Sequence, residues 1–555
     1  MKKSPLFWIL QRIRRRIPAI VLMTLAQVGH ALLMVFFALG TRGVIDSAVA
    51  GDSRAFTQAC ICQGAIIAGI LLCLTLLRHL RDRLDADLER DWKRSLLHGL
   101  LHGDYAEVSA YHSAELLNRL NNDVARVNDG VLSIIPGAAA MITRLVAAVT
   151  VLGVLDGRFT LVIAAAGIVV IAATAIMRRK LKELNKKVNE HDGKVSGFLQ
   201  ETMEKLLMVQ TMDVSDEVER RSDGLLNDRY EIQRKRKNVS LLTNTGISVM
   251  YQGAGFLALV WCSAQLLAGN MSFGSLTAIT QLVTQLQTPF VNLSGIMPKY
   301  VAMIASAERL MELEEIQGEP EPTTQDPVEM YSKMTAVKAD DLTFAYDRDE
   351  IFSHAEFTLP KGAFAVITGA SGIGKSTLLK LLLGVFRPST GGLYLSGERY
   401  EQPLDRSTRR LFSYVPQGNL LLSGTLRENL TIVRPEATEA EIAEALFVSA
   451  MEDYLPQLPK GLDTVLGESG SGLSEGQAQR LAIARAVLGG APVLLLDECT
   501  SALDAETEQK VLQRLKALPN RTFISVTHRP AAVKLCDWRL EVEDGKIRCV
   551  QVEQE

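Results

Sequence analysis

The chain has 555 residues, enough for more than one domain, and 47 % of them are hydrophobic. Its formal net charge of −3 at pH 7 gives no reason to expect nucleic acid as a partner. A mean hydropathy of +0.12 is high for a soluble protein of this size.

Six stretches before about residue 305 predict membrane-spanning helices, because crossing a bilayer takes roughly 20 apolar residues. They cover residues 17–40, 56–77, 132–155, 159–177, 246–268 and 273–303, of which the last is the most polar. An even number of spans places both ends of the chain on the same side of the membrane. A cleavable signal peptide is the alternative for the first stretch, but this stretch is too long for a signal's apolar core and has no clear cleavage site.

Basic residues gather before the first span and after the second and fourth spans. Cytoplasmic loops carry an excess of Lys and Arg, so the N-terminus and the C-terminal region are expected in the cytoplasm. We therefore predict a multi-pass protein of the cytoplasmic (inner) membrane. The basic residues are Lys2, Lys3, Arg12, Arg14, Arg15, Arg16, Arg78, Arg81, Arg83, Arg90, Lys93, Arg94, Arg178, Arg179, Lys180, Lys182, Lys186 and Lys187.

The segments that follow the second and fourth spans are long, charged and helical in pattern. They predict membrane helices that continue well into the cytoplasm and reverse at their far ends. Residues 116–127 and 206–213 lie near the middles of these segments and are the predicted turning points. They would offer surfaces to a cytoplasmic partner.

Seven cysteines are scattered along the chain without a disulfide framework, which fits a reducing compartment. Cys60 and Cys62 are the one closely spaced pair. No second Cys or His pair accompanies them and they lie in an apolar run, so a metal site there is disfavoured.

A polar stripe runs along the sixth span, where Gln281, Thr284, Gln285, Thr288 and Asn292 share one helical face. Polar groups are costly in lipid, so the stripe as a whole predicts the lining of a cavity for a polar or amphipathic cargo. For any single residue, hydrogen bonding to a neighbouring helix is the favoured alternative. The possible cavity residues are Gln27, His30, Arg144, Tyr251, Gln252, Gln281, Gln285 and Asn292.

A change of composition at residues 318–326, rich in Pro, Glu and Thr, predicts a linker. The expected organisation is a transmembrane domain over residues 1–316, a linker over 317–335 and a second domain over 336–555. In the second domain, apolar runs at 363–368, 493–497 and 522–527 predict buried parallel strands of an α/β fold.

The sequence from Gly369 to Ser376 matches the P-loop pattern G-x-x-x-x-G-K-[ST]. It follows the predicted strand 363–368 and opens a predicted helix at 376–383, which is the context that the motif requires. Its glycines let backbone N–H groups surround phosphate oxygens, and the helix N-terminus adds a favourable field. Lys375 would reach the β and γ phosphates of ATP, and Ser376 would bind Mg²⁺.

The apolar run 493–496 ends in two carboxylates, Asp497 and Glu498. Asp497 suits the holding of Mg²⁺ through water, and Glu498 would orient or deprotonate the attacking water. A surface acidic pair is the alternative, disfavoured downstream of a P-loop. Ser474 and Gly476 begin another helical run that extends to Leu488 and form a second phosphate-binding helix end. Because the P-loop has a helix end of its own, this one suggests a different nucleotide.

Taken together, the motifs resemble those of ABC transporters, specifically bacterial-like exporter-type half-transporters, over essentially the whole chain. The resemblance implies an all-α six-helix transmembrane domain followed by an α/β P-loop ABC nucleotide-binding domain. It also implies that Tyr346 stacks on adenine, that Glu468 faces the membrane domain and that His528 contacts the γ-phosphate. The remaining implied nucleotide residues are Gly369, Ser371, Gly372, Gly374, Lys375, Ser376 and Thr377 of Walker A, Gln417 of the Q-loop, which touches Mg²⁺, Ser474, Gly476 and Gln477 of the signature, and Asp504 of the D-loop. Glu475 departs from the glycine that is commonest in the signature, at a position that tolerates variation.

The resemblance further implies ATP-driven export by alternating access, with ATP and Mg²⁺ bound at composite sites between two half-transporters. Both Glu498 and His528 are present, which slightly favours a homodimer over a heterodimer. The alternatives are an ATP-gated channel or regulatory membrane protein, an importer on the same scaffold, and a soluble ABC ATPase acting on DNA or ribosomes. The apolar spans argue against the last. The sequence does not identify the cargo.

Overall fold

The computed structural model describes residues 4–319, 325–346, 349–418, 421–467 and 472–552; side chains within 168–176, 178–179 and 287–295 lie outside the description. The chain divides into two compact units. One, called the helical unit here, comprises Met1–His98 and Ser113–Glu315; the other, the α/β unit, comprises Gly99–His112 and Ile316–Glu555.

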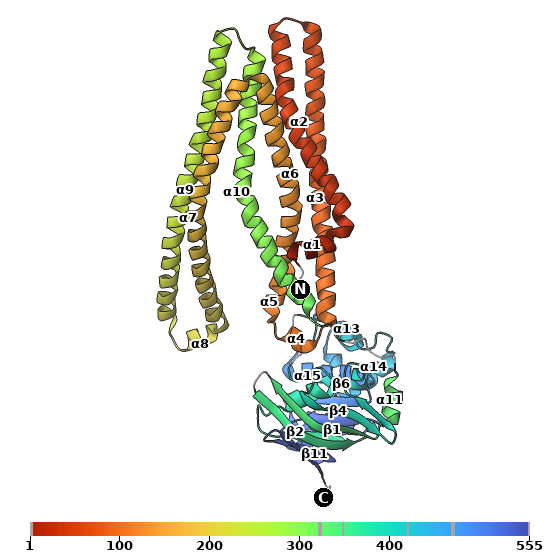
Figure 1. Ribbon diagram of the computed structural model, residues 1–555. Helices are drawn as coiled ribbons and strands as arrows, with labels where there is room; N and C mark the ends of the chain where they lie inside the picture. The colour runs from red at the N-terminus through yellow and green to blue at the C-terminus, as the bar shows by residue number, and fades with distance from the viewer. Residues whose placement is uncertain (1–3, 320–324, 347–348, 419–420, 468–471, 553–555) are drawn as a thin grey trace. The chain divides into compact units, whose positions relative to one another are not determined.

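Long helices make up most of the helical unit (Figure 1). They are α2 (Ile17–Val49), α3 (Ser53–His102), α6 (Val124–Leu155), α7 (Gly157–Glu204), α9 (Ser215–Leu267) and α10 (Phe273–Glu315). Short elements precede or connect them: α1 (Pro5–Ile13), η1 (Arg14–Arg16), α5 (Ser113–Asn118), η2 (Arg119–Asp123) and α8 (Leu206–Thr211). Helix α10 packs against α2, α6 and α9, and α7 packs along α9.

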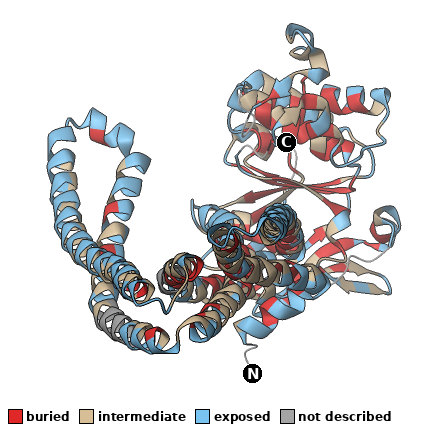
Figure 2. Ribbon diagram, turned by 90° about the horizontal axis from the view of Figure 1, so that it is seen from above, coloured by how far each residue is buried: buried red, intermediate tan, exposed pale blue. Residues whose placement is uncertain are grey.

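Four helical stretches among the described residues are long and apolar enough to cross a membrane: Pro5–Val49, Ser53–His102, Ser113–Leu155 and Ser215–Leu267. Within the most apolar window of Ser53–His102, no residue is buried inside the protein. In Figure 2 the long helices are coloured mostly as exposed or intermediate, with scattered buried residues. Apolar surface of this extent needs lipid to cover it. The predicted spans 159–177 and 273–303 fall on α7, whose described apolar part is Gly157–Gly167, and on α10.

The chain reverses at α8, between α7 and α9, which confirms the turning point predicted at residues 206–213 (Figure 1). The turning point predicted at 116–127 is wrong, because these residues lie within the continuous helical run from α5 to α6. The reversal comes earlier, at residues 103–112, and contains the short helix α4 (Tyr105–Ser109). Asp104 caps α4 by accepting a hydrogen bond from the Ala106 backbone N at 2.9 Å, so the chain stops one helix and starts another here.

A six-stranded sheet forms the centre of the α/β unit, in the order β12-β11-β3-β10-β9-β6. All neighbouring strands pair in parallel except β11 and β12. Three of its strands confirm the predicted buried parallel strands, namely β3 (Phe364–Thr368), β9 (Val493–Asp497) and β10 (Thr522–Val526). The others are β6 (Phe412–Val415), β11 (Trp538–Glu543) and β12 (Lys546–Gln551).

An antiparallel sheet in the order β2-β1-β4-β5 forms a second layer, and β7 and β8 form a short ribbon. These strands are β1 (Ala336–Tyr346), β2 (Asp349–Pro360), β4 (Thr390–Gly397), β5 (Tyr400–Pro403), β7 (Gly424–Thr425) and β8 (Val465–Leu466). The helices of the unit, besides α4, are α11 (Pro327–Lys333), α12 (Lys375–Leu382), α13 (Leu426–Thr431), α14 (Glu439–Val448), α15 (Glu475–Leu488), α16 (Ala505–Lys516) and α17 (Pro530–Leu535).

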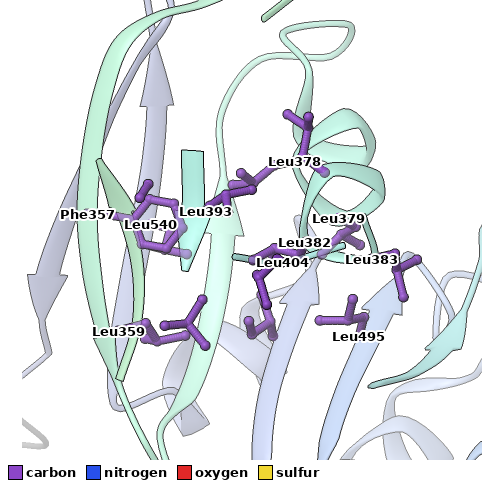
Figure 3. Packing of buried hydrophobic residues seen from close by; sticks show 14 of the residues in the cluster. Phe357, Leu359, Leu378, Leu379, Leu382, Leu383, Leu393, Leu404, Leu495 and Leu540 are labelled. Atoms are coloured by element: carbon purple, nitrogen blue, oxygen red, sulfur yellow. The ribbon is translucent and has the colours of Figure 1, made fainter. Parts of the chain in front are cut away.

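Two apolar cores hold the α/β unit together, one on each face of the central sheet. Leucines of α12 pack against both sheets in the first core, as Figure 3 shows. Successive residues of a strand point to opposite faces, so Leu495 enters this core whereas Leu494 and Leu496 enter the other, beneath α15 and α16. Strand β9 is therefore anchored on both faces, which holds the residues at its carboxyl end in place.

The second half of the predicted linker is not a linker. Residues 327–333 form α11, and Met330, Tyr331 and Met334 are buried in the first core. The Tyr331 hydroxyl lies 2.9 Å from Thr522 Oγ1 at the start of β10. Apolar residues in this part of the chain therefore belong to the α/β unit, and the Pro- and Glu-rich composition that suggested a linker ends before them.

Candidate nucleotide site

The P-loop joins the end of β3 to the start of α12 and depends on two glycines with left-handed backbone angles. Gly369 has φ of 151°, and Gly374 has φ of 105°. A Cβ at Gly374 would come within 2.3 Å of the Ile351 side chain, and one at Gly369 within 2.6 Å of the Val542 carbonyl oxygen. Only glycine fits both positions, so the loop can curl back on itself and direct backbone N–H groups inward.

Lys375 is the first residue of α12, and its buried side chain folds back over the loop. Its Nζ donates hydrogen bonds to the carbonyl oxygens of Gly369, at 2.9 Å, and Ala370, at 2.8 Å. The ammonium group is therefore held over the same loop that presents the helix N-terminus, and the two together favour a phosphate.

Ser376 and Asp497 meet across the site from different elements. Ser376 Oγ donates a hydrogen bond of 3.0 Å to Asp497 Oδ1, and the Tyr414 hydroxyl donates one of 3.2 Å to Oδ2. Asp497 is 2 % exposed. Burial, reinforced by the nearby Glu498 charge, raises the pKa of Asp497 above its usual value in spite of these two donors.

Glu498 follows Asp497 in an unusual backbone conformation, with φ of 48°. Its backbone N donates to the Val526 carbonyl oxygen at 3.0 Å, which ties the turn to the adjacent strand. The Gln417 Nε2 donates a 2.7 Å hydrogen bond to Glu498 Oε2. Left-handed angles at a residue other than glycine are costly and gather at functional sites, and here the turn directs the two neighbouring carboxylates differently.

The donor set around Asp497 fits magnesium. Ser376 and Gln417 offer neutral oxygens and Asp497 offers an anionic one, the hard ligands that Mg²⁺ prefers. Within the described residues there is no group of three or more His, Cys, Asp or Glu side chains that could hold a metal ion. One carboxylate with two neutral side-chain oxygens suits Mg²⁺, which usually takes one or two protein ligands and fills its other positions with phosphate and water.

A second helix end lies at α15, which begins after Ser474. Ser474 and Gln477 form a capping box, in which the Gln477 N donates to Ser474 Oγ at 3.3 Å and the Ser474 N donates to Gln477 Oε1 at 2.8 Å. A Cβ at Gly476 would lie 2.9 Å from the Ala502 carbonyl oxygen. The close approach of the 501–504 backbone therefore requires a small residue at 476.

The loop after β9 is fastened by residues that sequence reasoning missed. Gln479 Nε2 donates to Ser501 Oγ at 3.0 Å, and its Oε1 accepts from the Ala502 N at 3.1 Å. Arg529 Nη1 donates to the Leu503 carbonyl oxygen at 2.7 Å and to Glu508 Oε2 at 3.2 Å. These contacts join segments far apart in the sequence, so the only local signal was their proximity to motif residues.

Two further predicted residues flank the site. Asp504 caps α16 by accepting a 2.9 Å hydrogen bond from the Thr507 N, and this bond lowers the pKa of Asp504. His528 is exposed two residues beyond β10 and directly precedes Arg529. Glu468, predicted to face the membrane domain, lies outside the described residues.

Tyr346 ends β1 and lies beside the P-loop helix. Its hydroxyl is 3.3 Å from Thr377 Oγ1, and its ring makes edge contacts with Phe344 and Phe386 at centroid distances of 4.9 and 5.4 Å. The side chain remains 39 % exposed. A rigidly packed ring with an open side is suited to stacking on a nucleotide base.

The predicted cavity residues of the helical unit fall into several environments. Gln285 Nε2 donates to the Met34 carbonyl oxygen at 2.8 Å, which is the inter-helix role weighed as the alternative. Within the described part of the chain, the buried Oε1 atoms of Gln281 and Gln285 have no hydrogen-bond partner. Arg144 on α6 and His30 on α2 are both partly buried.

Tyr251 lines an apolar cavity of about 410 Å³ with residues from α6, α7, α9 and α10. Gln252 is exposed beside it on α9, and Gln27 is partly buried on α2. The side chain of Asn292 lies outside the described residues. The eight predicted residues are thus spread over several helices.

A P-loop, a buried aspartate at a neighbouring strand end, an adjacent glutamate and a separately capped helix end define a P-loop ATPase. Two family models match the chain: "ABC transporter transmembrane region" over residues 20–290 and "ABC transporter" over residues 352–501. The chain therefore belongs to the ABC transporters, as an exporter-type protein with the transmembrane region and the ATP-binding domain fused in one polypeptide. It is a multi-pass membrane protein and an ATPase coupled to transport.

Similar proteins match this chain over most of their own lengths. A probable ABC transporter ATP-binding/permease protein of Haemophilus influenzae is 26 % identical over 94 % of this chain and 95 % of its own. An ATP-dependent lipid A-core flippase of Desulfotalea psychrophila is 27 % identical over 84 % of this chain and 82 % of its own. The solved structure of a bacterial Atm1-family ABC exporter with ATP bound has a TM-score of 0.77 at 24 % identity, covering 97 % of this chain and 95 % of its own, and this likeness concerns the fold.

Proposed function

We propose that two copies of this chain form an ATP-driven exporter of the cytoplasmic membrane, with the N-terminus and the α/β unit in the cytoplasm. The observation that carries the proposal is the arrangement at the end of β9, where Asp497 contacts Ser376 of the P-loop helix and Glu498 contacts Gln417. Metal-holding and water-activating groups thus stand side by side next to a phosphate loop. Fused domains support a dimer, and the intact Glu498 and His528 favour identical partners.

The residues of the site divide the chemistry between them. Tyr346 stacks on the adenine, and Lys375 with the loop from Gly369 to Thr377 binds the phosphates. Glu498 orients the attacking water and accepts its proton, and His528 contacts the γ-phosphate. Ser376, Gln417 and Asp497 would hold Mg²⁺, which neutralises phosphate charge when bound.

A second copy completes the site in this proposal. The capped end of α15, with Ser474, Gly476 and Gln477, offers a phosphate-binding helix terminus in addition to the P-loop. We propose that it faces the ATP of the partner subunit, with Asp504 beside it. ATP then binds the closed pair of domains better than the open pair, and hydrolysis reverses the shift.

The proposed cargo is amphipathic. The apolar cavity beside Tyr251 offers about 410 Å³ for an apolar part, and Gln281 and Gln285 offer buried oxygens to a polar part. Gln27, His30, Arg144, Gln252 and Asn292 complete the proposed pathway. The lipid substrate named for the Desulfotalea relative is a molecule of this kind.

Glu498→Gln tests the proposed role of the carboxylate. The amide keeps the size of the side chain but cannot accept a proton, so steady-state ATP hydrolysis by the reconstituted protein should fall about 10²- to 10⁴-fold. Binding of a fluorescent ATP analogue should stay close to wild type. Glu401→Gln, a change at an exposed glutamate on β5, is the matched control and should leave hydrolysis intact. Near-normal turnover in Glu498→Gln would refute the assignment.

Direction and coupling need a separate measurement. In inverted vesicles, ATP should drive uptake of a fluorescent amphipathic compound against its gradient, and Glu498→Gln should abolish that uptake. Flux that runs only down the gradient would instead support a channel. ATP-dependent accumulation in right-side-out vesicles loaded with ATP would support an importer.

A further inference from the structure

A cavity of about 570 Å³ lies where the N-terminal helix α1 meets α3 and α10. It is lined by the indole rings of Trp8 and Trp92 and by four arginines of one short segment, Arg12, Arg14, Arg15 and Arg16, together with Gln11, Leu88, Asp91 and Glu314. All of these residues belong to the helical unit. Four cationic side chains thus face two carboxylates, and the nucleotide site accounts for none of them.

Contacts among the lining residues hold the walls in place. Trp8 Nε1 donates to Glu314 Oε2 at 2.8 Å, and its ring lies 4.9 Å from that of Trp92. Arg12 pairs with Glu314 and donates to Ser95 Oγ. Arg16 contacts Asp87 at 2.8 Å and Asp91 at 3.1 Å. The two carboxylates of the cavity are therefore already engaged by Arg12 and Arg16.

Arg14 and Arg15 differ from Arg12 and Arg16 in having no carboxylate partner among the described residues. Both are exposed, and neither has an ion pair or hydrogen bond within the part of the chain that the structure describes. They occupy the single turn η1 between α1 and α2. Two exposed, unneutralised guanidinium groups in the lining of an arginine-rich cavity attract an anion, and their planar donors suit a phosphate.

The expected position of helix α1 at the membrane indicates which kind of anion would bind at Arg14 and Arg15. Helix α1 buries Trp8, Ile9 and Ile13 but exposes Leu6, Phe7 and Leu10. Such a helix lies in the plane of the membrane interface with its exposed apolar side chains in the acyl region. Directly after η1, α2 enters the first span. A phosphate at Arg14 and Arg15 would therefore sit at headgroup depth, with acyl chains beside Phe7 and Leu10.

We propose that this cavity binds the headgroup of an anionic phospholipid, and that the bound lipid fastens α1 to α3 and α10. The inference rests on the membrane placement proposed above but not on the ATPase chemistry. Basic pockets between membrane helices are suited to such headgroups, and each arginine near an anionic surface contributes roughly 1 kcal/mol. Removing Arg14 and Arg15 together should thus weaken binding about 10- to 30-fold.

Quenching of tryptophan fluorescence by brominated lipids tests the site. The chain has four tryptophans, so the full-length W261F/W538F variant reports from Trp8 and Trp92. In neutral detergent micelles, brominated phosphatidylglycerol should quench saturably at about 10-fold lower mole fraction than brominated phosphatidylcholine. R14Q/R15Q should lose this preference, whereas R14K/R15K should retain most of it. R399Q/R410Q, which removes the same charge from exposed positions of the α/β unit, should behave like the parent.

A second measurement covers the case in which the tryptophan variant does not fold. Phosphatidylglycerol should raise the Tm of the unmodified chain more than phosphatidylcholine does, and R14Q/R15Q should abolish the difference. Equal effects of the two lipids, or an equal loss in R399Q/R410Q, would overturn the proposal. Displacement by millimolar inorganic phosphate would overturn it as well, in favour of a free-phosphate site. None of these lipid-binding measurements depends on ATPase activity. A result against the lipid site would therefore leave the proposed export function unaffected.

Discussion

Asp497 and Glu498 are neighbours in sequence with opposite surroundings. Asp497 ends a strand that is buried on both faces, and its burial raises the pKa of its carboxyl group. Glu498 turns away through a left-handed backbone and contacts Gln417. The buried Asp497 carboxylate favours a cation beside it, because an unpaired buried charge is costly. The Glu498 carboxylate lies within reach of water. These are the surroundings that the two proposed roles require.

The raised pKa of Asp497 predicts that this functional carboxylate lowers the stability of the folded protein at neutral pH. Because the folded pKa lies above the unfolded value, the folded state holds the proton more tightly, and ionisation above the folded pKa costs stability. The cost is absent below the unfolded pKa, about 4. Asp497→Asn should therefore raise the Tm of the nucleotide-free protein at pH 7.5, and the gain should disappear as the pH falls to about 4, while ATP hydrolysis is lost. A Tm at or below wild type at pH 7.5 would contradict this reading.

Ser474 at the start of helix α15 has both a structural role and a proposed functional role. The Ser474 hydroxyl caps the helix, and in the proposed dimer the same hydroxyl faces a phosphate of the partner's ATP. Two different substitutions of Ser474 are therefore needed to separate its effect on stability from its effect on ATP hydrolysis.

Ser474→Ala and Ser474→Asp make that separation. Alanine removes the cap and should cost about 1 kcal/mol of stability, whereas aspartate is an equally good cap and should cost little. Aspartate, however, places a negative charge opposite the phosphate, so ATP hydrolysis should fall more in Ser474→Asp than in Ser474→Ala. Thermal unfolding and ATPase rates measured on both variants check this. Activity that follows stability in the two proteins would show that Ser474 acts only as a cap.

At the scale of elements, local sequence was sufficient for some features and not for others. The P-loop, the strand ends and the capped start of α15 follow from residues within a few positions of each other, so their patterns were readable. Gln479 and Arg529 fasten the 501–504 loop from about 22 and 26 residues away, and nothing local marks such contacts. The missed reversal at 103–112 did carry a signal, Gly103 followed by the helix-capping Asp104.

At the scale of the whole molecule, an ionic cluster connects the N-terminal end of α6 with α10. Asp123 is completely buried and accepts hydrogen bonds from Ser306 at 2.9 Å and from Arg309 Nε at 2.8 Å. Arg119 donates to the Arg309 carbonyl oxygen at 2.7 Å and to Glu312 at 2.9 Å. On α10 the cluster occupies the last turns, before the chain passes into the α/β unit at Ile316.

Asp123→Asn should destabilise the helical unit strongly. The change leaves Arg309 without its anion, and breaking a buried pair costs about 3–5 kcal/mol, which the partial exposure of Arg309 reduces to about 2. Asp129→Asn is the control in the same continuous helical run, because Asp129 on α6 makes exposed ion pairs with Arg81 and Lys299. It should cost less than about 1 kcal/mol. Thermal unfolding in one detergent compares the two, and equal losses would argue against a special role for the buried cluster.

The grouping of residues 99–112 with the α/β unit bears on how the two units are joined along the chain. These residues include the end of α3, a helix of 50 residues that at about 1.5 Å per residue is about 75 Å long. The Tyr105 ring on α4, which follows α3, packs 6.0 Å from that of Phe386 within the α/β unit. One unbroken helix therefore contributes residues to both units, so helical backbone rather than an irregular linker connects them at this point.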